Sequence, residues 1–383
     1  MKFTANLAAL ANTVSKVSRA VAVRTPRSQL ANLFVNAKDG MLKIAGTDLE
    51  IMMLASLEAN VEVPGYFTVS AKLLQELLSS VSHTDEPEIN FEIIQENSEY
   101  SDGYVASALC VKCGRSKFNL LLQDASDYPP IPVLDDGNMS FVEFPTGAFL
   151  QSLIEASIAM NTTDMSAVQK SICLDLGDLA APKMAATDSK RLSITNITGF
   201  QLPEEFKRRF LLPARVVPEL KDLLSDNETL KIAMYNKQLV FTSENFTLIT
   251  SLIEGIFPDY VNVVPKNPTR TVVFERAALA RGLKLIVPIA RNVNDMVHLE
   301  VEAEETKIWT LDRETGRAES YVQSNLTGDP IHIAFNAKFI MDYLNVAESD
   351  EIAMEMTAPN YPVLLRQAEG EARFFYVLMP LTI

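Results

Sequence analysis

The residues best suited to hold a ligand are basic ones that recur at one position of a repeated pattern. An alanine, a cation and an apolar run with helical spacing occur together three times, at Ala71-Lys72, Ala214-Arg215 and Ala337-Lys338. The intervals are too long for a solenoid repeat and match the size of a whole domain. One cation in the same position of each domain predicts a positive surface, and lysine and arginine are the side chains that bind phosphate.

This positive surface would belong to an acidic protein. The 383 residues carry a formal net charge of −15 and a pI near 4.8, which by itself argues against a nucleic-acid partner. Net charge averages over the surface, however, whereas binding depends on where the cations lie. The length predicts two to four domains, and 48% hydrophobic and 22% charged residues are typical of a soluble protein with a large core.

Neither a membrane segment nor a signal peptide is visible in the sequence. No apolar run approaches the length that spans a bilayer, and the opening Met1-Lys2-Phe3-Thr4-Ala5-Asn6 lacks the features of a signal peptide. We therefore expect a cytoplasmic protein without a membrane partner.

Motifs for catalysis, cofactors or metals are weak. The histidines are His83, His298 and His332, and none lies in a nucleophile signature. The chain has no GxxxxGK[ST] loop and no GxGxxG. Cys110 and Cys113 form a CxxC, but it lies in a strand-like run without a second CxxC, so two structural thiols are favoured over a redox or zinc pair. We expect a protein that is not an enzyme and has no cofactor.

The elements that would position the cations also repeat three times. Each third opens with a short strand and an amphipathic helix, at residues 6–20, 148–160 and 277–287. Several strand-like runs follow, then a shorter helix with the alanine–cation pair, then more strands. This pattern predicts α+β domains with two helices on antiparallel sheet. We expect domains at 1–128, 138–258 and 262–383, and a surface loop at Gln95 to Ser101.

Sequence motifs spread along the chain resemble those of the bacterial β sliding clamp family, the processivity factors of replicative DNA polymerase. Any one motif is weak, but their order within a threefold repeat is specific. They are Met1-Lys2-Phe3-Thr4, Gly46-Thr47-Asp48-Leu49-Glu50, Gly114-Arg115-Ser116, Ala186-Thr187-Asp188 with Arg191-Leu192, Phe257-Pro258-Asp259-Tyr260 with Pro265-Lys266-Asn267, Phe335-Asn336 and Met379-Pro380.

The resemblance implies three tandem clamp domains and a head-to-tail homodimer that closes into a ring around double-stranded DNA. The helices would line the hole and the sheets would form the rim. Family partners are the replicative polymerase subunit, the clamp loader and other proteins with a clamp-binding motif. Cations that face the hole would hold duplex DNA through its phosphates without reading its bases.

Five cations are predicted to lie near DNA. Arg24 matches a family position associated with DNA contact, and the others rest on their expected place on helix faces. Each one alone could equally be an ordinary solvated surface cation. The set is Arg24, Lys72, Arg209, Arg215 and Lys338.

A pocket for partner peptides is implied by the resemblance at the boundary of the second and third domains. Leu192, Val377 and Leu378 could instead be ordinary strand core. The matching positions are Lys170, Thr187, Ser189, Lys190, Arg191, Leu192, Pro258, Asn262, Val263, Asn336, Phe339, Val377, Leu378, Met379, Pro380 and Leu381.

The sequence departs from the family at several of these positions. Ser189-Lys190 stands where a pair such as Gly-His is frequent, Lys170 replaces a leucine, and Asn262 replaces an arginine. The terminus is Leu381-Thr382-Ile383 rather than Met-Arg-Leu. We therefore expect a pocket whose motif preference differs from that of its relatives.

A dimer seam is predicted between the first domain of one chain and the third domain of another. Phe118 and Leu120 share one face of a strand and would pack against Ile289 of the other copy. They would equally suit the core of their own domain. A peptide-binding scaffold is the remaining alternative, but it would leave the repeated cations unexplained.

Overall fold

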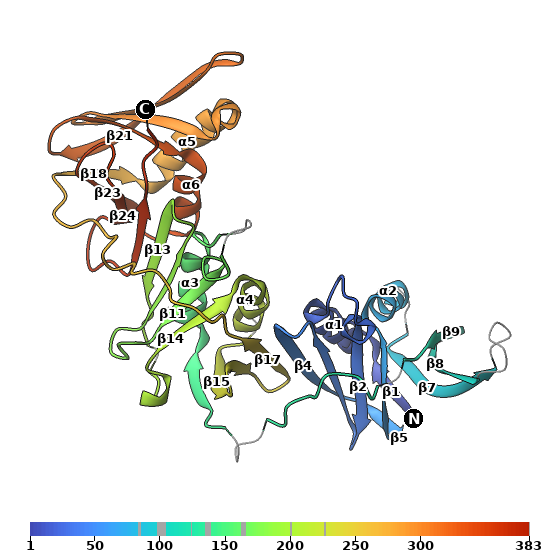
Figure 1. Ribbon diagram of the computed structural model, residues 1–383. Helices are drawn as coiled ribbons and strands as arrows, with labels where there is room; N and C mark the ends of the chain where they lie inside the picture. Colours follow the sequence, from blue (N-terminus) through green and yellow to red (C-terminus); the bar gives the residue numbers. More distant parts are fainter. Residues whose placement is uncertain are drawn as a thin grey trace. The chain divides into compact units, whose positions relative to one another are not determined.

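The structure is a computed structural model in which the chain forms two compact units (Figure 1). The first unit comprises residues 1–144 and 218–251, and the second comprises 145–217 and 252–383. The residues that the structure describes are 1–82, 86–97, 105–123, 125–134, 139–161, 166–199, 201–225 and 227–382. Residues 1–128, 138–258 and 262–383 are called the first, second and third repeat below.

Within its described residues, the first repeat has two α-helices and nine strands. Its elements are β1 Lys2–Asn6, α1 Leu7–Val17, η1 Ser18–Ala20, η2 Ser28–Ala31, β2 Asn32–Lys38, β3 Met41–Thr47, β4 Ile51–Glu58, β5 Asn60–Val63, β6 Gly65–Ser70, α2 Ala71–Val81, β7 Glu88–Asn97, β8 Val105–Cys113 and β9 Ser116–Leu121.

In its described residues the second repeat follows a similar order, with four strands between its two helices where the first repeat has five. Its elements are β10 Val142–Pro145, α3 Thr146–Ser157, β11 Ser171–Asp175, β12 Lys183–Thr187, β13 Arg191–Asn196, η3 Glu204–Phe206, β14 Arg209–Pro213, η4 Ala214–Val216, α4 Val217–Ser225, β15 Thr229–Tyr235, β16 Gln238–Thr242 and β17 Phe246–Ser251.

The third repeat completes the series. Its elements are β18 Arg270–Glu275, α5 Arg276–Ala290, η5 Arg291–Val293, β19 Met296–Val301, β20 Glu305–Asp312, β21 Gly316–Thr327, β22 Ile331–Asn336, α6 Ala337–Val346, β23 Glu351–Met356, β24 Val363–Gln367 and β25 Phe374–Leu378. The expectation of two helices on antiparallel sheet in each repeat is confirmed.

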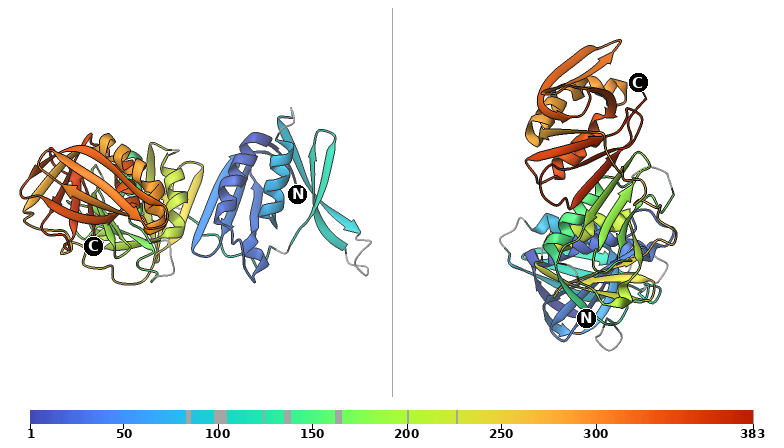
Figure 2. Two further views of the ribbon diagram at one scale, coloured as in Figure 1. Left: turned by 90° about the horizontal axis from the view of Figure 1, so that it is seen from above. Right: turned by 90° about the vertical axis from the view of Figure 1, so that its left-hand side faces the viewer.

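Apolar helix faces explain how the helices pack on the sheets. On α1, Leu7, Leu10, Val14 and Val17 are all buried, as their helical spacing predicts. Figures 1 and 2 show α1 beside α2 against the strands of the first repeat, and α5 beside α6 in the third. The helices therefore pack on strands with one face and leave their polar faces outside that core.

Strands of neighbouring repeats join into continuous sheets. In the first unit, β17 pairs antiparallel with β4, within the sheet order β10-β15-β16-β17-β4-β3-β2-β6. In the second unit, β25 pairs antiparallel with β13, within the order β14-β11-β12-β13-β25-β24-β23-β18-β21-β20-β19-β22. In both cases the last strand of one repeat pairs with the strand that comes after the Thr-Asp turn of the repeat before it. We call these pairings the first and second junctions.

Two strand edges remain that correspond to these junctions. Strand β9, the last of the first repeat, ends the sheet β5-β1-β7-β8-β9. Strand β21 pairs with β20 through Gly316–Gln323 and with β18 only from Ser324 onward. Within the described residues, therefore, β9 and the first part of β21 each have one edge without a strand partner.

Three smaller expectations can be compared with the fold. The prediction of a loop at Gln95 to Ser101 is wrong for its first three residues, whose backbone extends β7 and pairs with β8, while 98–101 lie outside the described residues. Cys110 and Cys113 are buried in β8 as free thiols. None of the described helices is long and apolar enough to cross a membrane.

Candidate nucleic-acid and peptide-binding sites

The repeated cation lies in the first turn of the second helix of each repeat. Lys72 and Lys338 are the second residues of α2 and α6, and Arg215 is the second residue of η4, which leads into α4. Lys72 and Lys338 are exposed, and Arg215 is half-buried. The preceding alanines Ala71 and Ala337 are buried at 1% and 0% exposure, so the helix start is fixed while the next side chain points outward.

Side-chain caps fix two of these helix starts. Ser70 Oγ accepts a hydrogen bond from Leu73 N at 3.4 Å, and Asn336 Oδ1 accepts one from Lys338 N at 2.9 Å. Such caps satisfy a backbone N–H that the first turn would otherwise leave free. The cations are therefore held at defined positions, although a cation at a helix N-terminus is opposed by the helix dipole.

Two cations at the C-terminal end of α1 and in the following η1 contact residues of the second repeat. Lys16 Nζ lies 5.0 Å from the centre of the Phe246 ring, and Arg19 forms ion pairs with Glu219 and Asp222. The polar face of α1 therefore contacts residues of the second repeat at the first junction.

Arg209 does not lie with the helix cations. It is a strand residue at the start of β14, and its Nε donates to Asp175 Oδ2 at 2.8 Å. Its guanidinium lies 5.6 Å from the centre of the Tyr260 ring. By strand alternation it shares a face with Leu211, which packs with Tyr260. The expectation of a helix-face position for Arg209 is wrong. Arg24, by contrast, is an exposed residue between η1 and η2.

A Thr-Asp turn between β12 and β13 organises the candidate peptide site. Thr187 Oγ1 donates to Arg191 O at 2.8 Å, and Asp188 Oδ1 accepts from the N–H groups of Lys190 and Arg191, both at 3.0 Å. Ser189 has a φ of 71°, in the left-handed region. The turn is thus closed by its own side chains, which fixes the position of Arg191.

Arg191 is the anchor of this site. Its side chain is 10% exposed, and its Nε donates to Asp188 Oδ2 at 2.9 Å. Its Nη1 donates to Asp342 Oδ2 at 2.6 Å and to Tyr376 Oη at 3.2 Å. The guanidinium also lies 4.2 Å from the centre of the Phe339 ring. Arg191 therefore ties the second repeat to helix α6 and strand β25 of the third.

The electrostatics of Arg191 result from this arrangement. Burial lowers the pKa of the guanidinium, but its contacts with Tyr376, Asp342 and Asp188 outweigh burial and leave the pKa above the ordinary value. Burial also raises the pKa of the Tyr376 hydroxyl. Arg191 thus keeps its charge, and this charge is already paired within the protein.

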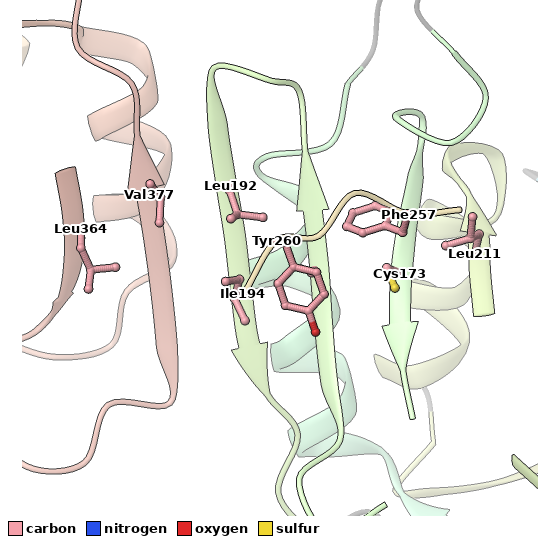
Figure 3. Packing of buried hydrophobic residues seen from close by; sticks show 9 residues of the cluster. Cys173, Leu192, Ile194, Leu211, Phe257, Tyr260, Leu364 and Val377 are labelled. Carbon is pink, nitrogen blue, oxygen red and sulfur yellow. The ribbon is translucent and has the colours of Figure 1, made fainter. Parts of the chain in front are cut away.

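An apolar cluster lies beside the anchor, on the opposite face of β13 from α3. Ser193 and Thr195 of β13 bond to Glu155 of α3, whereas Leu192 and Ile194 point to the other face. Figure 3 shows the cluster across β13, β25 and the linker. Its buried members are Cys173, Ala185, Leu192, Ile194, Leu211, Phe257, Tyr260, Leu364 and Val377.

The rim of this cluster is apolar and partly exposed. Met379 is 41% exposed and Val263 is 44% exposed. The Met379 N–H donates to Lys190 O at 2.9 Å, so the C-terminal segment continues along the turn. Leu192 lies opposite Val377 and Arg191 opposite Leu378 in the β13–β25 ladder. The structure therefore brings these predicted residues into one region.

The remaining predicted pocket residues surround this region or anchor it. Lys170 precedes β11 and accepts a backbone hydrogen bond from Ala214, and Asn262 Nδ2 donates to Asp259 Oδ2 at 2.7 Å. Leu381 N donates to Ala334 O at 2.8 Å. Pro258 is exposed and Pro380 is half-buried.

The predicted seam residues lie on two different kinds of element. Phe118 and Leu120 are half-buried on β9, whose outer edge is open, and their neighbour Leu121 is 68% exposed. Ile289 is half-buried near the end of α5, where Leu285 is 70% exposed. Both places carry apolar side chains that the chain itself leaves partly uncovered.

Sequence reasoning missed the partners that hold the second junction together. Asp342 and Tyr376 bond to Arg191, and Arg373 Nη2 donates to Glu155 Oε1 at 2.5 Å. Glu155 is 1% exposed, and burial raises its pKa, opposed by Thr195, Arg373 and Gln151. In the sequence, Glu155 could have been recognised as a carboxylate on the apolar face of a helix.

Comparisons with known proteins agree along the whole length. Family models of the DNA polymerase III beta subunit match in order, the N-terminal domain at residues 1–132, the central domain at 145–259 and the C-terminal domain at 261–382. A beta sliding clamp of Pseudomonas putida is 26% identical and aligns over 100% of both chains.

Solved structures give the same result. The DNA polymerase III subunit beta of Pseudomonas aeruginosa has a TM-score of 0.87 at 25% identity and covers 100% of both chains. A sliding clamp of Bartonella birtlesii bound to griselimycin has a TM-score of 0.88 at 22% identity, again over 100% of both.

The threefold fold and these matches define a DNA sliding clamp, a class of protein without catalytic activity of its own. The chain belongs to the DNA polymerase III beta subunit family. The expectations for the family, the fold class and the absence of an enzymatic role are confirmed by this membership.

Proposed function

We propose that the chain encircles duplex DNA and tethers the replicative polymerase to it. The observation that carries the proposal is the cation in the first turn of the second helix of every repeat, at Lys72, Arg215 and Lys338. Duplex DNA carries one charge per about 1.7 Å of axis, so a lining of cations holds it without a preferred register. Retention is then topological, and the charge centres the DNA. Arg24 is a further candidate for DNA contact.

Closure of the ring is supported by the two open strand edges. Each junction within the chain pairs the last strand of one repeat with the strand after the hairpin turn of the repeat before it. The open edges of β9 and β21 are the corresponding elements of the first and third repeats. A head-to-tail homodimer would pair them, with Phe118 and Leu120 packing near Ile289 of the partner copy.

The cluster beside Arg191 is the proposed pocket for partner peptides. Met379 and Val263 offer exposed apolar surface next to a closely packed floor, and methionine accommodates different ligands. The Bartonella birtlesii clamp, which has the same fold, has been solved with griselimycin bound. The proposed partners are the replicative polymerase subunit, the clamp loader and other proteins with a clamp-binding motif.

The departures at the rim give the pocket its own preference. Lys170 and Lys190 add positive charge where the family more often has neutral side chains, whereas Asn262 and the Leu381-Thr382-Ile383 terminus each lack an arginine of the family. The departures therefore move positive charge around the rim without increasing it, and we expect the preferred peptides to place acidic residues near Lys170 and Lys190. The protein would work in the cytoplasm and without a cofactor.

The DNA assignment is tested by reversing charge in the repeated position. Lys72→Glu, Arg215→Glu and Lys338→Glu together should weaken retention on circular DNA after loading. A matched triple variant at exposed lysines outside the helices, Lys38→Glu, Lys231→Glu and Lys266→Glu, should retain it. Cutting the circle should release the unmodified clamp. Equal retention by both triple variants would contradict the assignment of these three cations to DNA contact.

The pocket is tested separately by removing Met379 to Ile383. Binding of polymerase-derived peptides, measured by calorimetry, should be lost while sedimentation still reports two chains. Peptide affinity that survives this truncation would place the pocket elsewhere.

A further inference from the structure

A pair of histidines with neighbouring ring nitrogens lies in the third repeat, on the paired strands β19 and β22. His298 is on β19 and His332 is on the adjacent strand β22. In the antiparallel register His332 is opposite Glu300, two residues from His298, so the two histidines share one face of the sheet. Val297, Leu299 and Ile333 are buried on the other face.

The separation of the two rings fits two ligands of one ion. His298 Nδ1 lies 3.2 Å from His332 Nε2. Zinc–nitrogen bonds of about 2.0–2.1 Å in tetrahedral geometry place two ligand nitrogens about 3.3 Å apart. Without an ion, the same distance is that of a hydrogen bond between two neutral imidazoles. The nitrogen separation therefore suits two ligands of one ion, once the rings turn so that both lone pairs point at it.

Neighbouring side chains hold His298 in this position. The Trp309 ring stacks on it with centroids 4.0 Å apart and planes inclined by 13°. Trp309 Nε1 donates to Glu300 Oε1 at 2.9 Å, which fixes the indole in turn. Ring orientation set by such outer contacts is typical of metal-binding histidines.

The charged groups around the pair are balanced rather than strongly acidic. Lys307 Nζ lies 3.8 Å from Glu300 Oε2 and 3.6 Å from Glu319 Oε2, and the Arg317 guanidinium lies 5.4 Å from the centre of the Trp309 ring. Within the described part of the chain, no cluster of three or more His, Cys, Asp or Glu side chains is placed to hold a metal ion. The protein would therefore supply two imidazole ligands, and water would complete the coordination.

We propose that His298 and His332 form a two-histidine site for a borderline transition-metal ion, with Cu²⁺ bound more tightly than Zn²⁺. Imidazole ligands suit both ions, and the general order of stability places Cu²⁺ first. Hard cations such as Mg²⁺ prefer oxygen ligands and would not compete. An ion held by both rings would join β19 to β22 in the folded state and so stabilise the third repeat. The two histidines are not among the residues proposed for DNA or peptide binding, although Leu381 of the peptide site bonds to Ala334, the residue opposite His298.

The sole tryptophan of the chain is a built-in reporter of the site. Titrating full-length protein with CuCl₂ should quench Trp309 fluorescence saturably at one ion per chain, and ZnCl₂ should reverse part of the quenching by competition. MgCl₂ should do neither. Calorimetry should give the same stoichiometry without relying on the indole.

Three single variants make the test specific. His298→Gln and His332→Gln should each weaken Cu²⁺ binding at least tenfold, because each removes one of two ligands. His332→Gln keeps the closer His298–Trp309 stack, with centroids 4.0 Å apart, but removes the His332 ring that lies 6.0 Å from the indole, so calorimetry and not quenching decides its effect on Cu²⁺ binding. His83→Gln, which changes the third histidine of the chain, should bind as the unmodified protein does.

Two results would overturn the site. One is quenching that never saturates at one ion per chain. The other is calorimetric affinity for Cu²⁺ that is unchanged in both His298→Gln and His332→Gln. Circular dichroism and sedimentation of each variant should match the unmodified protein, so that a loss of binding reports the ligands and not the fold.

Discussion

The two junctions inside the chain use the same turn but differ in the residue that comes after it. Thr47 Oγ1 donates to Ile51 O at 2.7 Å in the first junction, and Thr187 Oγ1 donates to Arg191 O at 2.8 Å in the second. Leu49 and Ser189 both occupy the left-handed region, with φ of 77° and 71°. The residue that starts the next strand is a buried isoleucine in one case and an arginine in the other.

This single difference changes how each junction is held. Ile51 is 1% exposed and lies opposite the buried Thr250, so the first junction at this point is ordinary sheet core. Arg191 instead bonds across to Asp342 and Tyr376 of the third repeat. The repeated turn therefore gives both junctions the same backbone geometry. Only the second junction has an arginine in place of the isoleucine, and so only the second has a polar anchor beside an apolar cluster.

The buttressing ion pairs differ between the junctions as well. In the first, the Arg19 side chain is 42% exposed and pairs with Glu219, whose side chain is 5% exposed, and with the half-exposed Asp222. In the second, Arg373 pairs with Glu155, whose side chain is 2% exposed. Because desolvation decides the cost of an unpaired charge, the two arginines are expected to matter unequally.

The largest effect is expected from Arg373→Met. This change leaves Glu155 buried without its guanidinium and should destabilise the second junction by about 3 kcal/mol. The measurement is hydrogen exchange of the β13 and β25 amides, which should accelerate while β4 and β17 stay unchanged. Since whole-chain unfolding need not be two-state, local exchange is the better readout.

A matched double variant controls for lost packing. Glu155→Gln with Arg373→Met removes both charges and should recover most of the protection. If the double variant exchanges as fast as Arg373→Met, the effect does not come from the buried carboxylate.

A smaller effect is expected from Arg191→Met. Its carboxylate partners Asp188 and Asp342 are partly exposed and can be hydrated, so the loss should be about 2 kcal/mol. The same variant should weaken peptide binding by displacing Phe339 and the turn. Hydrogen exchange at the turn amides, followed across a urea titration, measures the change in local stability. Unchanged protection of these amides would contradict the anchor role of Arg191.

Arg19→Met at the first junction should cost less, about 1 kcal/mol or below, because Arg19 is more exposed than Arg373 and its ion pair with Asp222 is screened. Its effect on β4 and β17 exchange should shrink further in high salt. A loss as large as that of Arg373→Met would remove the proposed contrast between the junctions.

The smallest expected effect is a pH dependence at Glu155. The folded-state pKa of this carboxyl is raised above its ordinary value of 4.5, so its stabilising contribution is present below that pH and is lost as pH rises through the raised value. The stability of Glu155→Gln relative to the unmodified protein should therefore improve as pH increases from about 4.5. A difference that stays flat with pH would mean that Glu155 titrates normally.

Periodic features were readable from the sequence. The apolar spacing of α1 and the recurrence of the alanine–cation pair led to the helices, their buried faces and the threefold plan. These features repeat locally, so a single chain displays them. Pairing between distant strands is different, because the β13–β25 and β4–β17 ladders join segments far apart in sequence, and no local pattern specifies their partners.

The candidate site was predictable only in part for the same reason. Thr187 to Leu192 and Met379 were found through a local motif that resembles the family. Asp342, Tyr376 and Arg373 were missed because their roles arise from long-range contacts. Arg209 was predicted to lie on a helix face from its charge alone. The structure places it on strand β14, where strand alternation puts it beside Tyr260.

The central claim is that a third junction, between two chains, repeats the two junctions within each chain. Hydrogen exchange at β9 and at residues 316–323 of β21 tests it most directly, at a protein concentration where sedimentation shows two chains. We predict protection of both edges comparable to that of β17 and β25, since all four would lie in continuous ladders. Fast exchange at both edges, as for open strands, would contradict the closed ring.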